Sequence, residues 1–163
     1  MRGGFKPERI LAVLMDEGVE FVVGGDYAGI LHGARFATAD LDVLVRYDAH
    51  NLGRLSRALG RLGARVWAPD VHEGLPFEHD AYSLLMWTVL NLVTRHGRLD
   101  VVAEWNGIGD YGQALRRATL VQVDRRPVAV LAVEALIAAK RAAGRDKDQR
   151  KLDVLRRLQR ERR

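Results

Sequence analysis

The order in which helical and strand patterns follow one another restricts most strongly how this chain can fold. Short strands alternate with helices as far as about residue 62, a mixed set of strands follows, and helices finish the chain. A doubly wound sheet needs strands and helices to alternate along its whole length, so this order excludes a regular one. We predict an α/β (α+β) chain, with a small mixed sheet flanked by helices and a helical C-terminal tail.

The residue patterns place the individual elements along the chain. The residue patterns predict helices at 7–18, 49–62, 111–118, 133–143 and 147–160. Asp26 as a cap and Gly33 as a stop predict a further helix at 26–32. Runs rich in branched apolar residues predict strands at 21–23, 41–45, 88–94, 99–103, 120–123 and 128–131. Residues 64–67 are expected to form an edge strand, and residues 69–79 an irregular loop.

Length and composition indicate one domain that can bury its own core. The chain has 163 residues, of which 48% are hydrophobic, and no Cys. We expect a single domain over 1–163, with its core at about 6–131 and the helical tail at about 132–163. Without Cys, a metal has only oxygen or imidazole ligands. The longest apolar stretches are too short to span a membrane, so we expect a cytoplasmic protein with no membrane partner.

The balance of charge favours polyanionic partners. The formal net charge is +5 with a pI of about 10, and Arg is concentrated at the C-terminal end. Such a charge suits nucleotides or RNA. For the arginines between 156 and 163, however, we favour the solvent face of a helix whose Leu152, Leu155 and Leu158 pack inward.

Paired carboxylates stand at the start of the second predicted strand. Asp40 and Asp42 alternate with Leu41, so their side chains project from one face about 6.5 to 7 Å apart. Carboxylates this close repel each other unless a cation lies between them, and hard oxygen ligands suit Mg²⁺ or Mn²⁺. Asp100, after a predicted hairpin turn, is the candidate third ligand, with Glu104 in reserve. Alternatively, Asp40 and Asp42 form a solvated strand entry, and Asp100 is an ordinary turn residue.

Two glycines lie between the first predicted strand and the next helix. Gly24 and Gly25 leave backbone N–H groups free to contact phosphate oxygens. Asp26 stands where the dinucleotide fingerprint needs glycine, and the Gly-Lys-Ser/Thr of the common phosphate loop is absent. The pair could also serve only to permit a tight turn between strand and helix.

Taken in order, these motifs resemble the nucleotidyltransferase fold of the polymerase-beta-like superfamily. The residues that carry the resemblance are VVGG at 22–25, TADLDVLV at 38–45 and GRLDVV at 97–102. The tail, with EALIAAK at 134–140 and GRDKD at 144–148, is similar to that of AbiEii-type abortive-infection toxins and related small bacterial nucleotidyltransferases. The likeness runs from about residue 21 to residue 155. That family often has Ser after its first Gly, whereas Gly25 offers only its backbone.

The resemblance implies a metal-dependent transfer of a nucleoside monophosphate from a triphosphate to an acceptor. It implies two bound ions, Mg²⁺ or Mn²⁺, a tRNA or protein acceptor, and a cognate antitoxin as a possible partner. The residues it assigns are Asp40, Asp42 and Asp100 for metal and catalysis, and Gly24, Gly25, Lys140 and Asp148 for the nucleotide.

Other readings remain open at this point. An antibiotic-modifying transferase would use the same chemistry, and a non-catalytic module with this fold would bind only a nucleotide or a partner protein. Lys140 is expected to be largely exposed, where it either contacts phosphate or forms surface salt bridges with Asp148 at the helix junction. Arg145 is expected either to brace Asp148 or to reach the acceptor.

Overall fold

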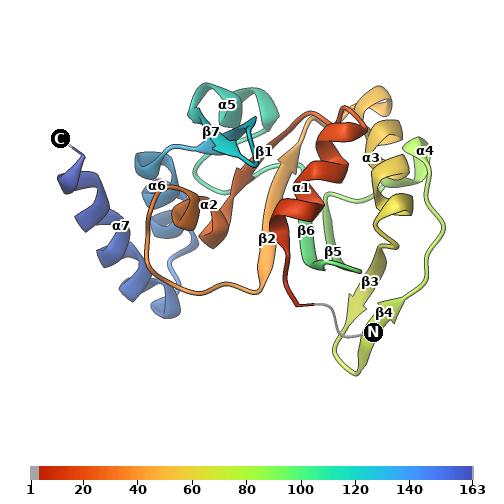
Figure 1. Cartoon of the computed structure of the whole chain (residues 1–163), viewed down its shortest axis with the longest axis horizontal. Helices are drawn as coiled ribbons and strands as arrows, with labels where there is room; N and C mark the ends of the chain where they lie inside the picture. Colours follow the sequence, from red (N-terminus) through yellow and green to blue (C-terminus); the bar gives the residue numbers. More distant parts are fainter. Residues whose placement is uncertain (1–3, 163) are drawn as a thin grey trace.

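The computed structural model describes residues 4–162, which form helices around one mixed sheet (Figure 1). The sheet has eight strands in the order β4-β3-β5-β6-β2-β1-β8-β7. The strands are β1 (Phe21–Gly24), β2 (Asp40–Val45), β3 (Arg65–Ala68), β4 (Val71–Leu75), β5 (Val89–Thr94), β6 (Gly97–Val102), β7 (Ala118–Val123) and β8 (Arg126–Leu131).

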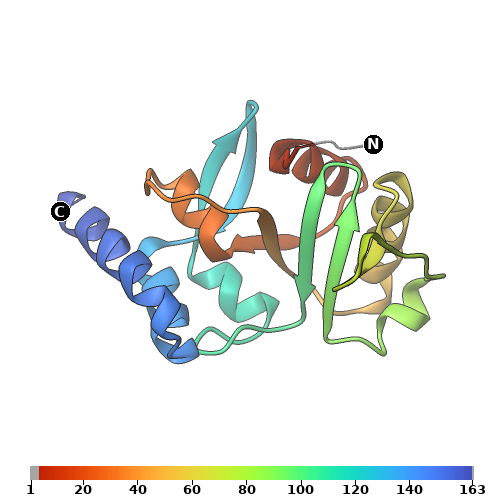
Figure 2. The same ribbon diagram turned by 90° about the horizontal axis from the view of Figure 1, so that it is seen from below.

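Helices lie on both faces of the sheet. They are α1 (Pro7–Asp16), α2 (Gly25–Leu31), α3 (Ala49–Arg61), α4 (Ala81–Leu84), α5 (Tyr111–Arg116), α6 (Val133–Ala143) and α7 (Gln149–Glu161), with the 3-10 turn η1 (Asp146–Asp148). Figures 1 and 2 show α1 and α3 on one face and α5 on the other, while α6 and α7 lie beside α2 at the end away from β3 and β4.

Strands β2 and β6 run parallel at the centre of the sheet and decide where the site lies. Leu41, Val43 and Leu99 are fully or almost fully buried, so these positions face the core. The intervening residues point to the opposite face, because side chains alternate along a strand. In the register of the two strands, Asp42 lies directly opposite Asp100.

Most of the predicted elements are present, including the hairpin of β5 and β6 and the helical tail. The mixed order of parallel and antiparallel pairs confirms that the sheet is not doubly wound. In the tail, Leu152 and Leu155 are buried and Leu158 packs against the core, as the helical spacing predicted. Of the arginines from 156 onward, Arg163 lies outside the described residues.

The prediction for residues 64–79 is wrong in two ways. Residues 71–75 are not an irregular loop but strand β4, which pairs with β3, so that β3 is not the edge of the sheet. All residues of β4 except Gly74 are exposed, and a solvated edge strand lacks the apolar alternation that marks a strand in sequence. Helix α4 was also not predicted; its four residues are too few for a helical period.

No helix within residues 4–162 is long and apolar enough to cross a membrane.

Candidate active site

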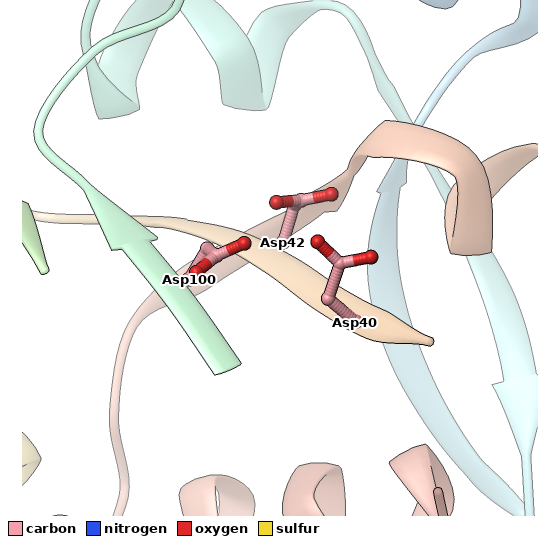
Figure 3. A group of neighbouring side chains, drawn as sticks. All are labelled: Asp40, Asp42 and Asp100. Atoms are coloured by element: carbon pink, nitrogen blue, oxygen red, sulfur yellow. The ribbon is translucent and has the colours of Figure 1, made fainter. Parts of the chain in front are cut away.

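Three carboxylates gather on one face of the sheet (Figure 3). Asp40 and Asp42 come from β2 and Asp100 comes from β6, and each offers an oxygen that lies within 4.8 Å of the others. Leu41 and Leu99, between and beside them, are fully buried on the opposite face. The strand register therefore holds three acidic groups together, and the buried leucines fix which way they point.

This closeness makes full ionisation of the cluster unfavourable. Burial, together with the charges of Asp40, Asp100 and Asp26, raises the pKa of the Asp42 carboxyl to about 8. Burial and a hydrogen bond with Asp40 raise the pKa of Asp100 to about 6, although the charge of Arg98 acts in the opposite direction. At neutral pH, the cluster therefore keeps a proton unless a cation replaces it.

Two neighbours contact the cluster directly. The Arg98 guanidinium lies 3.4 Å from Asp100 Oδ1, and within residues 4–162 it is the single basic group that forms an ion pair with any of the three carboxylates. Thr38 Oγ1 donates a hydrogen bond to Asp40 Oδ1 at 3.1 Å. Arg98 belongs to the same face of β6 as Asp100, whereas Thr38 orients Asp40 from the preceding turn.

The glycine pair allows the backbone to approach the cluster closely. Gly25 has a φ of +62°, and a Cβ there would lie 2.0 Å from Asp42 Oδ2. A Cβ on Gly24 would lie 2.4 Å from the ring of Trp105. Any side chain at either position would therefore displace a residue of the site, so the glycines do more than permit a turn.

A buried ion-pair cluster ties the helical tail to α2. Lys140 Nζ donates to Asp26 Oδ1 at 2.7 Å and lies 3.4 Å from Asp148 Oδ1, and Lys151 also pairs with Asp26. Arg145 Nε donates to Asp148 Oδ2 at 2.7 Å, which is the first of its two expected roles. Burial opposes ionisation of Asp26, but the hydrogen bonds and charges of Lys140 and Lys151 prevail and lower its pKa.

The expectation that Lys140 is largely exposed is wrong. Its side chain is only 10% exposed, and that of Asp148 only 4%, because α2 and η1 close over the end of α6. The ion pair of Lys140 with Asp148 is therefore a buried contact between segments of the fold. A buried ammonium that holds two carboxylates contributes differently from a surface pair, since losing it leaves Asp26 with Lys151 alone and Asp148 with Arg145 alone.

A cavity of about 370 Å³ opens beside the cluster, between the carboxylates and α6. Asp42 and Gly25 form one wall, and Lys140 and Arg145 contribute positive charge to another. Trp105 and Asn106, from the loop after β6, also line it, together with Leu131, Leu136, Ala139 and Ala143. Gly24 and Asp148 do not line this cavity, and exposed Glu104 is not part of the carboxylate group.

The residues present fit a divalent cation. The donors are three carboxylates, which are the hard oxygen ligands that Mg²⁺ and Mn²⁺ prefer. Burial first, and then the charges of Asp40, Asp100 and Asp26, raise the pKa of Asp42. A cation held by Asp40, Asp42 and Asp100 would relieve this repulsion.

Sequence reasoning missed three residues that the structure places at the site. Asp26 was predicted only to cap α2, whose cap in the structure is Gly24; it instead pairs with Lys140 and adds to the field at Asp42. Arg98 precedes Asp100 by two positions, so strand alternation could have placed it on the same face. Trp105 comes from a loop with no periodic pattern, and only the folded chain brings its ring against Gly24.

The comparisons with known proteins find a likeness in structure and none in sequence. No protein-family model matches the chain, and no curated protein sequence matches it. The candidate nucleotidyltransferase TM1012 from Thermotoga maritima superimposes with a TM-score of 0.56, at 17% identity, over 98% of each chain. At this identity the likeness establishes a shared fold.

Two antibiotic-modifying enzymes have the same fold. The lincosamide antibiotic adenylyltransferase LnuA, solved with bound lincomycin, has a TM-score of 0.62 at 15% identity, over 96% of this chain and 99% of its own. ANT(2'')-Ia, solved in complex with adenylyl-2''-tobramycin, has a TM-score of 0.53 at 18% identity, over 96% of this chain and 95% of its own.

The buried position of Lys140 leads to a prediction about stability. Lys140→Ala removes one of the two cations that contact each of Asp26 and Asp148, so we expect the free energy of unfolding to fall by about 1 to 3 kcal/mol. The matched control is Lys147→Ala, an exposed residue of η1, which should change it by less than about 0.5 kcal/mol. Urea unfolding followed by circular dichroism measures the free energy of unfolding of both variants. Equal changes in the two variants would show that the buried ion pairs of Lys140 do not stabilise the fold.

The raised pKa of Asp42 leads to a prediction about pH. Asp42 keeps its proton up to about pH 8 in the folded chain but loses it near 3.8 when unfolded. The contribution of this difference in pKa to the free energy of unfolding is therefore fully present below about pH 4 and is lost as the pH rises through 8. Without metal, the wild type should lose on the order of 1 to 3 kcal/mol relative to Asp42→Asn between about pH 5 and pH 8. Urea unfolding in EDTA tests this; stability curves that stay parallel would mean that Asp42 ionises normally.

Proposed function

We propose that this chain, which has the nucleotidyltransferase fold of the polymerase-beta-like superfamily, is a metal-dependent nucleotidyltransferase. It moves a nucleoside monophosphate from a nucleoside triphosphate to a hydroxyl group of an acceptor. The observation that carries the proposal is the convergence of Asp40, Asp42 and Asp100 beside a cavity with cationic residues. A protein that only bound a partner would have no use for three carboxylates that repel one another.

The cavity beside the carboxylates is the proposed place of the triphosphate. Its Lys140 and Arg145 complement phosphate charge, and Gly25 allows phosphate oxygens to approach the backbone at the start of α2. The ammonium of Lys140 has three N–H donors, of which Asp26 and Asp148 engage two, so one remains for a phosphate oxygen. Trp105 offers a flat apolar surface to the nucleoside.

The transfer exchanges one phosphorus–oxygen bond for another. The acceptor oxygen forms a bond to the α-phosphorus, while the bond from that phosphorus to the bridging oxygen breaks and its electron pair leaves with pyrophosphate. Asp100 accepts the proton of the attacking hydroxyl and later releases it to solvent. Two ions, Mg²⁺ or Mn²⁺, held by Asp40, Asp42 and Asp100, would when bound neutralise the phosphates and acidify the hydroxyl.

The acceptor can be of two kinds. The resemblance of the tail to AbiEii-type proteins supports a tRNA or protein acceptor, with the chain acting as a toxin that a cognate antitoxin restrains. The shared fold with LnuA and ANT(2'')-Ia favours a small antibiotic as the second candidate. A non-catalytic module that binds a nucleotide or partner is the remaining alternative.

Transfer itself is tested with α-labelled triphosphates. The protein is incubated with each one, Mg²⁺ or Mn²⁺, and a bacterial extract of RNA and protein. We expect one triphosphate to label a macromolecule, and Asp42→Asn or Asp100→Asn to lower the rate at least about 100-fold, because each removes a charge from the catalytic group. The destination of the label separates RNA, protein and added antibiotic. Unaltered labelling by both variants would refute the carboxylate mechanism.

Donor binding is tested without turnover. Mn²⁺ together with a nonhydrolysable triphosphate should raise the melting temperature, because a ligand of the folded state stabilises it by mass action. Asp42→Asn should abolish the rise, whereas the exposed surface variant Arg57→Ala on α3 should retain it. A rise that persists in Asp42→Asn would place the cation elsewhere. No rise in the wild type would favour a module that does not bind nucleotide.

A further inference from the structure

The face of the sheet that carries the carboxylates continues beyond them, away from the cavity. In the register of β5 and β6, Asn91 lies opposite Asp100 and Val89 opposite Val102, and directly paired residues share a face. Beyond β5, the ring of Trp67 on β3 lies under Arg98, whose guanidinium carbon is 4.8 Å from the ring centroid. We refer to Trp67, Val89, Asn91 and Arg98 as the open sheet face.

The residues of this face remain accessible although they adjoin the buried cluster. Trp67 is 41% exposed as a residue and Val89 52% exposed, and the side chain of Arg98 is 34% exposed. Two successive contacts connect the face to the carboxylates, from Trp67 to Arg98 and from Arg98 to Asp100. A molecule that lay on Trp67 and Arg98 would therefore be within reach of Asp100.

The geometry of phosphoryl transfer assigns a substrate to this face. The attacking and leaving oxygens lie roughly in line on opposite sides of the phosphorus. If the triphosphate occupies the cavity on the α6 side of the carboxylates, pyrophosphate leaves on that side. The acceptor hydroxyl then arrives from the opposite side, where β6, β5 and β3 present the open sheet face.

We propose that Trp67 and Arg98 bind the acceptor, and that they select one with a flat nucleobase next to the hydroxyl that is modified. This inference rests on the proposed function. The indole of Trp67 and the planar guanidinium of Arg98 are surfaces on which bases stack. Arg98 also provides a charge for a phosphate of the acceptor.

The charge of the open sheet face argues against a polycationic acceptor. Its four named residues include one cation and no acid, and Arg98 is paired with Asp100. An aminoglycoside carries several ammonium groups and would meet an arginine at the place of entry. A nucleobase at the end of an RNA strand, or one in a free nucleoside, carries no positive charge and can stack on Trp67 and Arg98.

The test measures acceptor binding while the cavity is filled. With Mn²⁺ and a nonhydrolysable triphosphate at saturation, fluorescence anisotropy follows a labelled single-stranded RNA hexamer. We expect Trp67→Ala to weaken its binding about 10-fold or more, as for loss of one stacked base, and Trp67→Phe to retain most of the affinity. Arg98→Lys, which keeps the charge but lacks the planar guanidinium group, should weaken hexamer binding less than Arg98→Ala.

Controls separate this inference from the proposed function. Tyr82→Ala removes an aromatic side chain that is 76% exposed on α4, and it should leave hexamer binding unchanged. Trp67→Ala should keep the rise in melting temperature with Mn²⁺ and triphosphate. If that rise is absent even in the wild type, the proposed function fails; if it is present and Trp67→Ala binds the hexamer normally, only the acceptor assignment fails.

Competition identifies the source of the base. Displacement of the hexamer only by unlabelled RNA supports an RNA end, and displacement by adenosine at similar concentration supports a free nucleoside. Displacement of the hexamer by tobramycin, together with loss of tobramycin binding in Trp67→Ala, would overturn the assignment in favour of a cationic acceptor. Failure of the wild type to bind RNA or adenosine would overturn it as well.

Discussion

The parallel pairing of β2 with β6 is the constraint on which the site depends. It sets Asp42 opposite Asp100, and the pleat of β2 then brings Asp40 to the same face. Leu41, Val43 and Leu99 are buried on the other side, so a slip of one residue would move the acids into the core. The hydrophobic core thereby enforces a concentration of negative charge that the carboxylates alone would avoid.

This repulsion explains why the surroundings of the cluster are so closely defined. Gly25 leaves room for Asp42, Thr38 orients Asp40, and Arg98 offsets part of the charge of Asp100. Of these neighbours only Arg98 carries a positive charge, and burial with the charges of Asp40, Asp100 and Asp26 raises the pKa of Asp42 to about 8. The arrangement is one that a divalent cation and the phosphates it accompanies would complete.

A second set of charges joins the tail to this centre. Asp26 stands at the start of α2, next to Gly25, and receives Lys140 from α6 and Lys151 from α7. Because Asp26 also contributes to the field at Asp42, the tail affects the electrostatics of the cluster as well as one wall of the cavity. The tail is therefore part of the site, and the cavity exists only when α6 packs against α2.

The sequence by itself determined those features that depend on neighbours along the chain. Alternation placed Asp40 and Asp42 on one face, helical spacing placed Leu152 and Leu155 inward, and the Gly24–Gly25 turn marked the start of α2. Tertiary structure decided what depends on contacts between distant segments: the burial of Lys140, the stacking of Arg98 on Trp67, and the pairing of solvated β4. Local patterns report which face of an element is apolar, but the partner that covers a polar group is chosen only when separate elements pack together.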